Sequence, residues 1–251
     1  MAITIVSGNR GTATEKTSDQ TLSLTPSANL ALGNYGLLAV VIDNTGAGEG
    51  VTTDLSVTDN KGHVWMKLRE QTESNTAALT GSTCALFLAY LATGLTTSDT
   101  ISIAIAANST AKGAGLAELS VIGGNMLVLS NSGANGSNAA GATSYSVALS
   151  GLTNVAGLYV GMSSCEDEVD TACTLDAGYA EIGFGSIGSG AAGVPTSNVR
   201  ARVGTLANTS TGDTFDASGL TASDRATILV RLEEQRWPRN PAINHQNPAY
   251  L

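Results

Sequence analysis

The sequence predicts an all-β protein built as an antiparallel β-sandwich, and three observations lead to this expectation. Short runs alternate apolar and polar residues, Gly, Asn, Asp and Ser separate these runs, and charged residues make up only 13% of the 251 residues. A period of two indicates strands with one buried face, and regularly spaced turns indicate a sandwich or barrel. The low charge favours sheets and turns, because exposed helix faces are usually rich in Glu, Lys and Arg.

The stretch 101–105 shows the alternation most clearly. Its three isoleucines share one face, whereas Ser102 and Ala104 share the other, so we expect one face to be buried. Further runs have the composition of strands and are bounded by turn residues. They are residues 3–8, 21–26, 35–43, 83–91, 116–122, 126–131, 144–150, 157–164, 179–185, 199–206 and 226–234.

Residues 54–68 have the pattern of a hairpin. Asp59, Asn60 and Gly62 tolerate positive φ and supply the turn. Apolar residues alternate on both sides of it and are expected to face the core. These residues are Leu55, Val57, Val64, Met66 and Leu68.

Two segments admit a helix as well as a strand. Residues 109–122 contain glycines that lower helix propensity. Residues 223–236 carry a possible N-cap at Asp224 and good helix formers after it, but the alternation of Ile228, Val230 and Leu232 favours a strand.

The two halves of the chain share a weak internal similarity. "GLTTSDTISIAIA" starts at Gly94 and "GLTASDRATILVRL" at Gly219; upstream, 35–43 parallels 156–164 and 83–91 parallels 200–208. The similarity predicts a half-to-half duplication, although Gly-Leu-Thr and Ser-Asp are also simply good turn residues. No proline-rich or charged linker separates the halves, so one merged sandwich is expected over two independent domains.

The succession "LLAVVID", "VTDNKGHVWMKL", "ALFLAYLATGLTTSDTISIAI" and "AELSVIGG" resembles the jelly-roll-like β-sandwich domains of virion proteins of tailed bacteriophages and of some bacterial surface proteins. The resemblance covers residues 20–234 and implies a jelly-roll-like fold and a structural role in a virion. It carries no catalytic residue.

Charge and hydropathy exclude several classes of partner. The net charge is −9, and the 12 Lys and Arg residues form no cluster, so we expect no nucleic acid and no anionic membrane as partner. No apolar run approaches the roughly 20 residues of a membrane span, and the start lacks a secretory leader. The expected location is a virion assembled from protein made in the host cytoplasm.

The chain shows no catalytic signature, and we expect neither an enzyme nor a bound cofactor. His63 and His245 are interpreted as surface histidines. "GFGSIG" at 183–188 matches a dinucleotide-binding pattern, but glycines and Pro195 follow where a helix would be required.

Residues 165–173, "CEDEVDTAC", concentrate four acids in a short run. Hard oxygen ligands at this spacing could hold calcium, yet no defined ligand pattern is present, and a solvated loop is the simpler interpretation. Cys165 and Cys173 could close a disulfide in an oxidising medium, whereas cytoplasmic thiols stay reduced. Cys84 is expected in the core.

The last sixteen residues differ from the rest, and the expected organisation is one sandwich domain at 1–235 followed by an extended C-terminal arm at 236–251. Prolines exclude a continuous helix or a central strand there. Trp, Tyr and Arg are typical interface anchors. The predicted interface residues are Arg236, Trp237, Pro238, Arg239, Pro241, Ile243, Tyr250 and Leu251.

The sequence therefore predicts a structural virion protein, a capsid decoration or cement protein that forms a homo-oligomer and binds a major capsid or tail protein through its arm. The alternative is a tail or receptor-binding module that binds glycans through loops near 44–52, 130–143 and 163–176. A glycan-degrading enzyme ranks last.

Overall fold

The computed structural model describes residues 3–43, 55–73, 81–122, 125–137, 144–166, 173–189, 198–218 and 225–236. These residues form sixteen strands and no helix, and the strands pair antiparallel throughout. This confirms the all-β antiparallel sandwich. Within the described part no helix is long and apolar enough to cross a membrane.

The first half of the chain winds eight strands into two sheets. The larger sheet has the order β1-β8-β3-β6-β5 and the smaller has β2-β7-β4. The first strand therefore pairs with the eighth, the second with the seventh and the third with the sixth, which is the wrapping of a jelly roll. The strands are β1 (Ile3–Glu15), β2 (Asp19–Leu24), β3 (Tyr35–Asp43), β4 (Ser56–Asp59), β5 (Trp65–Glu73), β6 (Ser82–Tyr90), β7 (Ile101–Ser109) and β8 (Lys112–Val121).

The second half repeats this wrapping. Its larger sheet has the order β12-β14-β11-β16-β9, with β13 also on β14, and β10 pairs with β15 in the smaller one. An isolated bridge between Thr174 and Ser218 replaces the third outer strand. The strands are β9 (Met126–Ser137), β10 (Ser144–Leu149), β11 (Gly157–Cys165), β12 (Ala180–Glu181), β13 (Ile187–Ser189), β14 (Val199–Asn208), β15 (Asp213–Ser218) and β16 (Arg225–Gln235).

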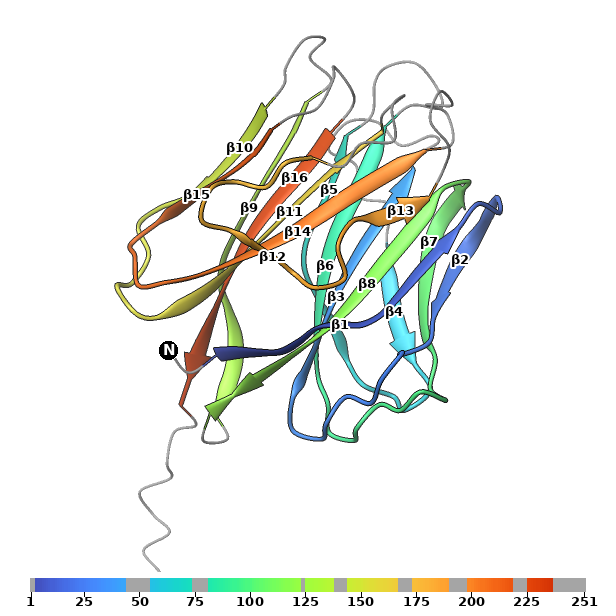
Figure 1. The fold of residues 1–251 in the computed structure, drawn as a ribbon, viewed down its shortest axis with the longest axis horizontal. Coiled ribbons are helices and arrows are strands. Elements are labelled where there is room, and N and C mark those ends of the chain that lie inside the picture. Colours follow the sequence, from blue (N-terminus) through green and yellow to red (C-terminus); the bar gives the residue numbers. More distant parts are fainter. Residues whose placement is uncertain are drawn as a thin grey trace, which may run out of the picture.

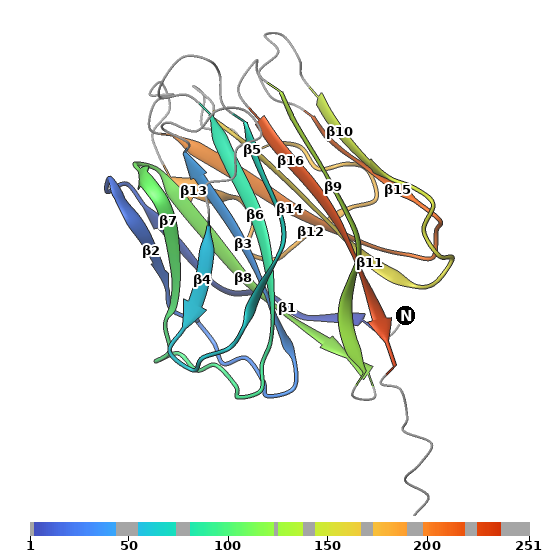
Figure 2. The same ribbon diagram turned by 180° about the vertical axis from the view of Figure 1, so that it is seen from behind.

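The sheets stack in four layers (Figures 1 and 2). The two larger sheets lie in the middle, β2, β4 and β7 cover one side, and β10 and β15 cover the other. One apolar cluster fills the space between the larger sheets, and one fills each outer sandwich. Central strands are thus buried on both faces, which explains the continuous apolar runs of β3, β6 and β11.

The duplication is present in the topology, and the sequence similarity found it only in part. The parallels of 35–43 with 156–164 and of 83–91 with 200–208 join equivalent strands, β3 with β11 and β6 with β14. The strongest match is misaligned, because Gly94 precedes β7 whereas Gly219 precedes β16, the counterpart of β8. Turn residues recur before many strands, so their recurrence does not mark equivalence.

The predicted hairpin at 54–68 is wrong, although its turn is correct. Gly62 has a φ of 78°, but β4 pairs with β7 and β5 pairs with β6. The turn therefore carries the chain from the outer sheet to the larger one. Leu55, Val57 and Leu68 are buried as expected, whereas Val64 and Met66 are exposed.

Residues 109–122 contain strand β8, in keeping with their low helix propensity, and 223–236 contain strand β16, as the alternation favoured. The expected loop at 130–143 is wrong over 130–137, which belongs to β9 and pairs with β16. Small residues are needed there because the side chains of Val147 and Leu149 lie against Gly133. Small residues that are typical of loops therefore allow strand β10 to pack closely on β9.

Candidate functional site

The predicted interface residues lie mostly beyond the part of the chain that the structure describes. Arg236 is described and exposed, directly after the end of β16. Trp237, Pro238, Arg239, Pro241, Ile243, Tyr250 and Leu251 lie outside the described residues. Their role as an interface stays a prediction, and the structure fixes only the point at which the arm begins.

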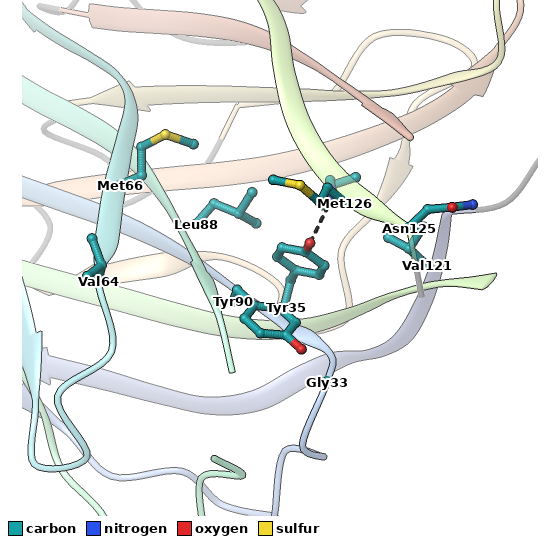
Figure 3. Close-up of a pocket in the computed structure, with 10 residues that line it drawn as sticks. Gly33, Tyr35, Val64, Met66, Leu88, Tyr90, Val121, Asn125 and Met126 are labelled. Carbon is teal, nitrogen blue, oxygen red and sulfur yellow. Dashed lines mark hydrogen bonds between the residues drawn. The ribbon is translucent and has the colours of Figure 1, made fainter. Parts of the chain in front are cut away.

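An apolar groove lies beside that point (Figure 3). It has a volume of about 560 Å³. The last residue of β16, Gln235, pairs with Met126, a residue of the groove wall. The lining residues are Gly33, Tyr35, Val64, Met66, Leu88, Tyr90, Val121, Asn125, Met126 and Leu127.

Three of the seven large hydrophobic side chains that are exposed in the described part of the chain line the groove. Val64 is 83% exposed, Tyr90 53% and Met66 45%. Leu32 and Ile122 are also exposed, and each is the sequence neighbour of a lining residue. Scattered exposed hydrophobic residues are normal, but a contiguous patch of them indicates an interaction surface.

Contacts between the two halves hold the groove in shape. The backbone N–H of Leu127 donates to the hydroxyl of Tyr35 at 2.9 Å (Figure 3). The ring of Tyr35 packs against that of Tyr90 with centroids 5.3 Å apart. The Asn125 amide donates to the carboxylate of Glu234 in β16. The wall formed by the start of β9 is thereby tied to both β3 and β16.

Val64 and Met66 point outward because the turn before β5 fixes the orientation of that strand. The indole N–H of Trp65 donates to Asp59 at 2.8 Å and the ring is buried. Trp65 packs in the outer apolar cluster of the first half, so its two neighbours in an extended strand must face the other side of the sheet, where the groove lies. Leu68 shares that face with Met66 and is covered by the cluster between the larger sheets.

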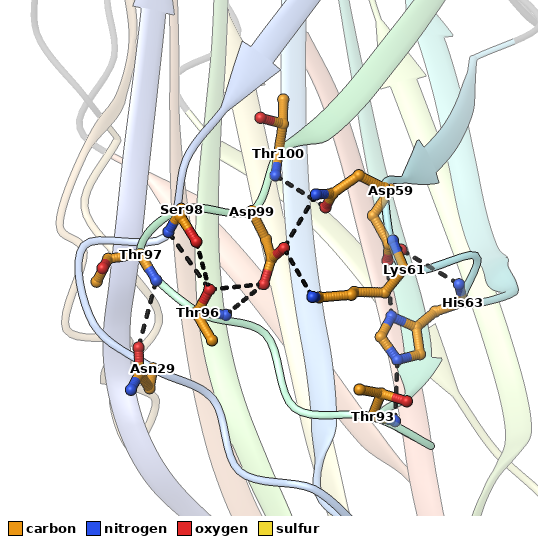
Figure 4. A network of polar contacts seen from close by, with 11 residues as sticks. Asn29, Asp59, Lys61, His63, Thr93, Thr96, Thr97, Ser98, Asp99 and Thr100 are labelled. Atoms are coloured by element: carbon orange, nitrogen blue, oxygen red, sulfur yellow. Dashed lines mark hydrogen bonds and ion pairs between the residues drawn. The ribbon is translucent and has the colours of Figure 1, made fainter.

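A polar network holds this corner (Figure 4). Besides Trp65, Asp59 accepts bonds from the backbone N–H groups of Lys61 and His63 and from the ring of His63. Next to it, Asp99 accepts from Thr96 and from the Asn60 amide and pairs with Lys61. The turn of the first half is therefore built on two buried carboxylates.

The charges of these two carboxylates are stabilised by their donors. Burial by itself raises the pKa of Asp59, but the N–H groups of Trp65 and His63 outweigh it and hold that pKa below its ordinary value. The backbone N–H of Thr96 lowers the pKa of Asp99 well below its usual range.

The interpretation of His63 as a surface histidine is wrong. Its side chain is only 3% exposed, with Nδ1 at 2.9 Å from Asp59, and Nε2 accepts the backbone N–H of Thr93. These partners assign the neutral tautomer with the proton on Nδ1. Both ring nitrogens are hydrogen-bonded, so His63 stabilises the turn before β5. His245 lies outside the described residues.

At the opposite end, the larger sheets enclose buried charged groups. Asp43, Glu73, Glu166 and Arg225 are all less than 5% exposed and lie at or beside strand ends. Glu166 accepts the backbone N–H of Gly81, joining the two halves. Burial raises the pKa of Asp43 to about 8, so this carboxyl is mostly protonated at neutral pH.

The acidic run at 165–173 differs from the expected solvated loop where it is described. Glu166 is buried, while 167–172 lie outside the described residues and leave the calcium alternative open. Cys84, Cys165 and Cys173 are buried, and no disulfide joins the pair at 165 and 173. Burial raises the pKa of Cys173 to about 11 and keeps it a thiol.

The remaining sequence motifs, where the structure describes them, have structural roles. Among the described residues, no group of His, Cys, Asp and Glu side chains could hold a metal ion. Residues 187 and 188 of the glycine-rich 183–188 belong to strand β13 and not to a helix. Of the expected strand at 179–185 only Ala180 and Glu181 form β12, and Gly185, with a φ of 70°, lies in the connection that follows. The Phe184 ring instead covers Gly115.

Comparisons with protein-family models, with curated proteins and with solved structures find no match for this chain.

Proposed function

We propose that this protein is a structural component of a tailed-bacteriophage particle, a capsid decoration or cement protein that forms a homo-oligomer and binds the major capsid protein or a tail protein. Its C-terminal arm, residues 236–251, is the attachment device. The proposal includes no enzymatic activity, no bound cofactor, no nucleic acid and no membrane.

One observation carries the proposal. The described chain ends at Arg236 beside a patch of exposed apolar side chains, among them Val64, Met66 and Tyr90. The arm that follows contains Trp and Arg residues, which are frequent anchors of protein interfaces. The jelly-roll wrapping of both halves agrees with the resemblance to virion domains, although a fold alone does not define a function.

The test is a truncation that ends the chain at Gln235. Purified particles are incubated with the full chain or with the truncated chain, and the protein retained after sedimentation is measured. We expect retention to fall at least tenfold on truncation, with no change in the unfolding temperature. Equal retention of the two chains would show that the arm does not attach the protein to the particle.

A second candidate is a tail or receptor-binding module that recognises glycans. The loops that would bind follow β3, β9 and β11, and the ends of these strands lie close together. The hydroxyl of Ser82, opposite Asp43, contacts that of Ser164, and Cys165 lies across β16 from Ser137. Binding on a glycan array that is lost with a calcium chelator would favour this function over attachment by the arm.

A further inference from the structure

We infer that the apolar groove is the docking site for residues 237–251 of a second copy of this chain. The inference rests on the proposed function and deepens it by naming the contact through which the homo-oligomer forms. The occupant is an extended peptide with a tryptophan near its start and apolar residues near its end.

The shape of the groove fits an extended chain better than a small molecule. A second hollow of about 310 Å³ shares Val64 and Tyr90 with the groove and continues past His63 and Thr93. The apolar surface is therefore elongated along the start of β5. An extended peptide buries alternate side chains along such a surface.

The chemistry of the groove also matches the arm. Two methionine side chains, Met66 and Met126, line it, and flexible thioethers adapt to aromatic rings. Glu234 lies at the rim, bonded to Asn125, while the arm carries Arg236 and Arg239. An arm with a tryptophan and two cations therefore meets an apolar surface with an acidic rim.

The place where the arm begins favours exchange between two copies. Gln235 pairs with Met126, so the arm and the groove lie at the same end of the molecule. A twofold axis at this end places the arm of each copy at the groove of the other and forms two identical contacts at once.

The sequence of the arm disfavours a return to its own groove. Trp237 follows the rim residue Gln235 by two positions, so entry into the same molecule's groove requires an immediate reversal. Pro238 restricts Trp237 to extended conformations, and Pro241 stiffens the next turn of chain. The sequence therefore favours binding to another copy over entry into the same molecule's groove.

The test is the mass of the full chain as a function of concentration, measured by sedimentation velocity, with charge placed in the groove. Val64→Asp is the main variant, because Val64 is 83% exposed and we expect its replacement to leave the unfolding temperature unchanged. Met66→Asp is the second groove variant, and Trp237→Ala removes the proposed anchor. Val155→Asp is the matched control, since Val155 is also an exposed valine but does not line the groove.

We expect the wild type and Val155→Asp to dimerise alike, and Val64→Asp and Trp237→Ala to weaken dimerisation at least tenfold. A mixture of these two variants should regain part of the dimerisation, because one of the two contacts in a mixed dimer joins an intact arm to an intact groove. A monomeric wild type, or dimerisation unaffected in both groove variants, would overturn the inference. A monomer whose Trp237 fluorescence shifts to longer wavelength in Val64→Asp would show that the arm occupies its own groove.

Retention on particles separates this inference from the proposed function. If Val64→Asp remains a dimer and the truncated chain still loses the particle, the inference fails and the proposed function stands. If the truncated chain keeps the particle, the proposed function fails whatever the result for the groove.

Discussion

Glu118 in β8 and Arg231 in β16 are each the seventh residue of the last strand of their jelly-roll half, and each is fully buried. Glu118 accepts bonds from the backbone of Ala31 and the amide of Asn34, both in the loop before β3. Arg231 instead donates to the backbone carbonyl groups of the loop before β11, at Thr153 and Val155.

In both halves a buried charged side chain fixes the loop that leads into the third strand, but the sign of the charge is opposite. An acid accepts from N–H groups in one half, and a base donates to carbonyl groups in the other. Lys112 and Arg225, the first residues of the same two strands, are likewise both fully buried. Lys112 donates to the carbonyl oxygens of Thr17 and Thr21.

We expect the largest loss of stability from substitutions at Arg231 and Glu118. Arg231→Met leaves two carbonyl groups without their donor and Glu233 without its partner at 3.1 Å. We expect a loss of about 4 kcal/mol in the free energy of unfolding, measured in urea. Glu118→Gln keeps one accepting oxygen and should cost about 2 kcal/mol.

Arg236→Met, at the exposed position beyond the same strand, is the control for the loss of positive charge and should change stability by less than about 0.5 kcal/mol. Equal losses for Arg231→Met and Glu118→Gln would mean that the two loops do not depend on the chemistry of the buried charge.

The next largest loss of stability is expected in the turn before β5 of the first half. The second half has only a single bridge, between Thr174 and Ser218, at the equivalent place. Asp59→Ala leaves the buried N–H of Trp65 and the ring of His63 without their acceptor. We expect a loss of about 3 kcal/mol and a changed near-ultraviolet circular dichroism signal of Trp65. Asp176→Asn, in the stretch before β12, should cost less than about 0.5 kcal/mol, since its bond to the backbone of Asp216 is exposed. A larger loss at Asp176 would reverse the comparison.

A smaller effect comes from the aromatic rings that cover glycines in each half. A methyl group on Gly161 would lie 2.5 Å from the Phe215 ring, and one on Gly115 would lie 2.7 Å from Phe184. Each Gly→Ala change should cost about 2 kcal/mol through overpacking. Adding Phe215→Leu to Gly161→Ala should cost less than the sum of the two single changes. If the losses of the two single changes simply add in thermal unfolding, contact with the Phe215 ring is not what excludes a side chain at position 161.

A separate effect, measured per pH unit, is a pH dependence set by a carboxyl group of the first half. Asp43 ends β3, whereas Cys165 ends the equivalent β11. Because the pKa of Asp43 is raised from 3.8 to about 8 by burial, the folded chain keeps a proton that the unfolded chain loses between these values. Stability should therefore fall as the pH rises from 4 to 8, by at most about 1.4 kcal/mol per pH unit. Urea unfolding of Asp43→Asn should lose this contribution to the slope, and an unchanged slope would contradict the assignment.

The sequence was sufficient for the fold class because outer strands alternate buried and exposed residues, as at Ile101 and Ile103 of β7, and central strands such as β3 form continuous apolar runs. It failed where a long-range contact sets the orientation. Val64 and Met66 were expected in the core, but the bond of Trp65 to Asp59 turns them outward, and no periodicity contains that information.

The groove could not be predicted for the same reason. It joins residues from the first half, such as Tyr90, with Met126 of the second, and their proximity depends on how the two larger sheets pack. The Asp-x₅-Trp spacing from Asp59 to Trp65 was the one local signal available. The buried position of Glu166 also arises from the partner half, through Gly81.

The account's central claim is that the molecule works through the end at which its arm begins. The most direct measurement is the weight-average mass of the full chain and of the chain ended at Gln235, over the same range of concentrations. We predict that the full chain associates with increasing concentration and that the truncated chain remains a monomer with an unchanged unfolding temperature. The same mass for both chains at every concentration would contradict the claim.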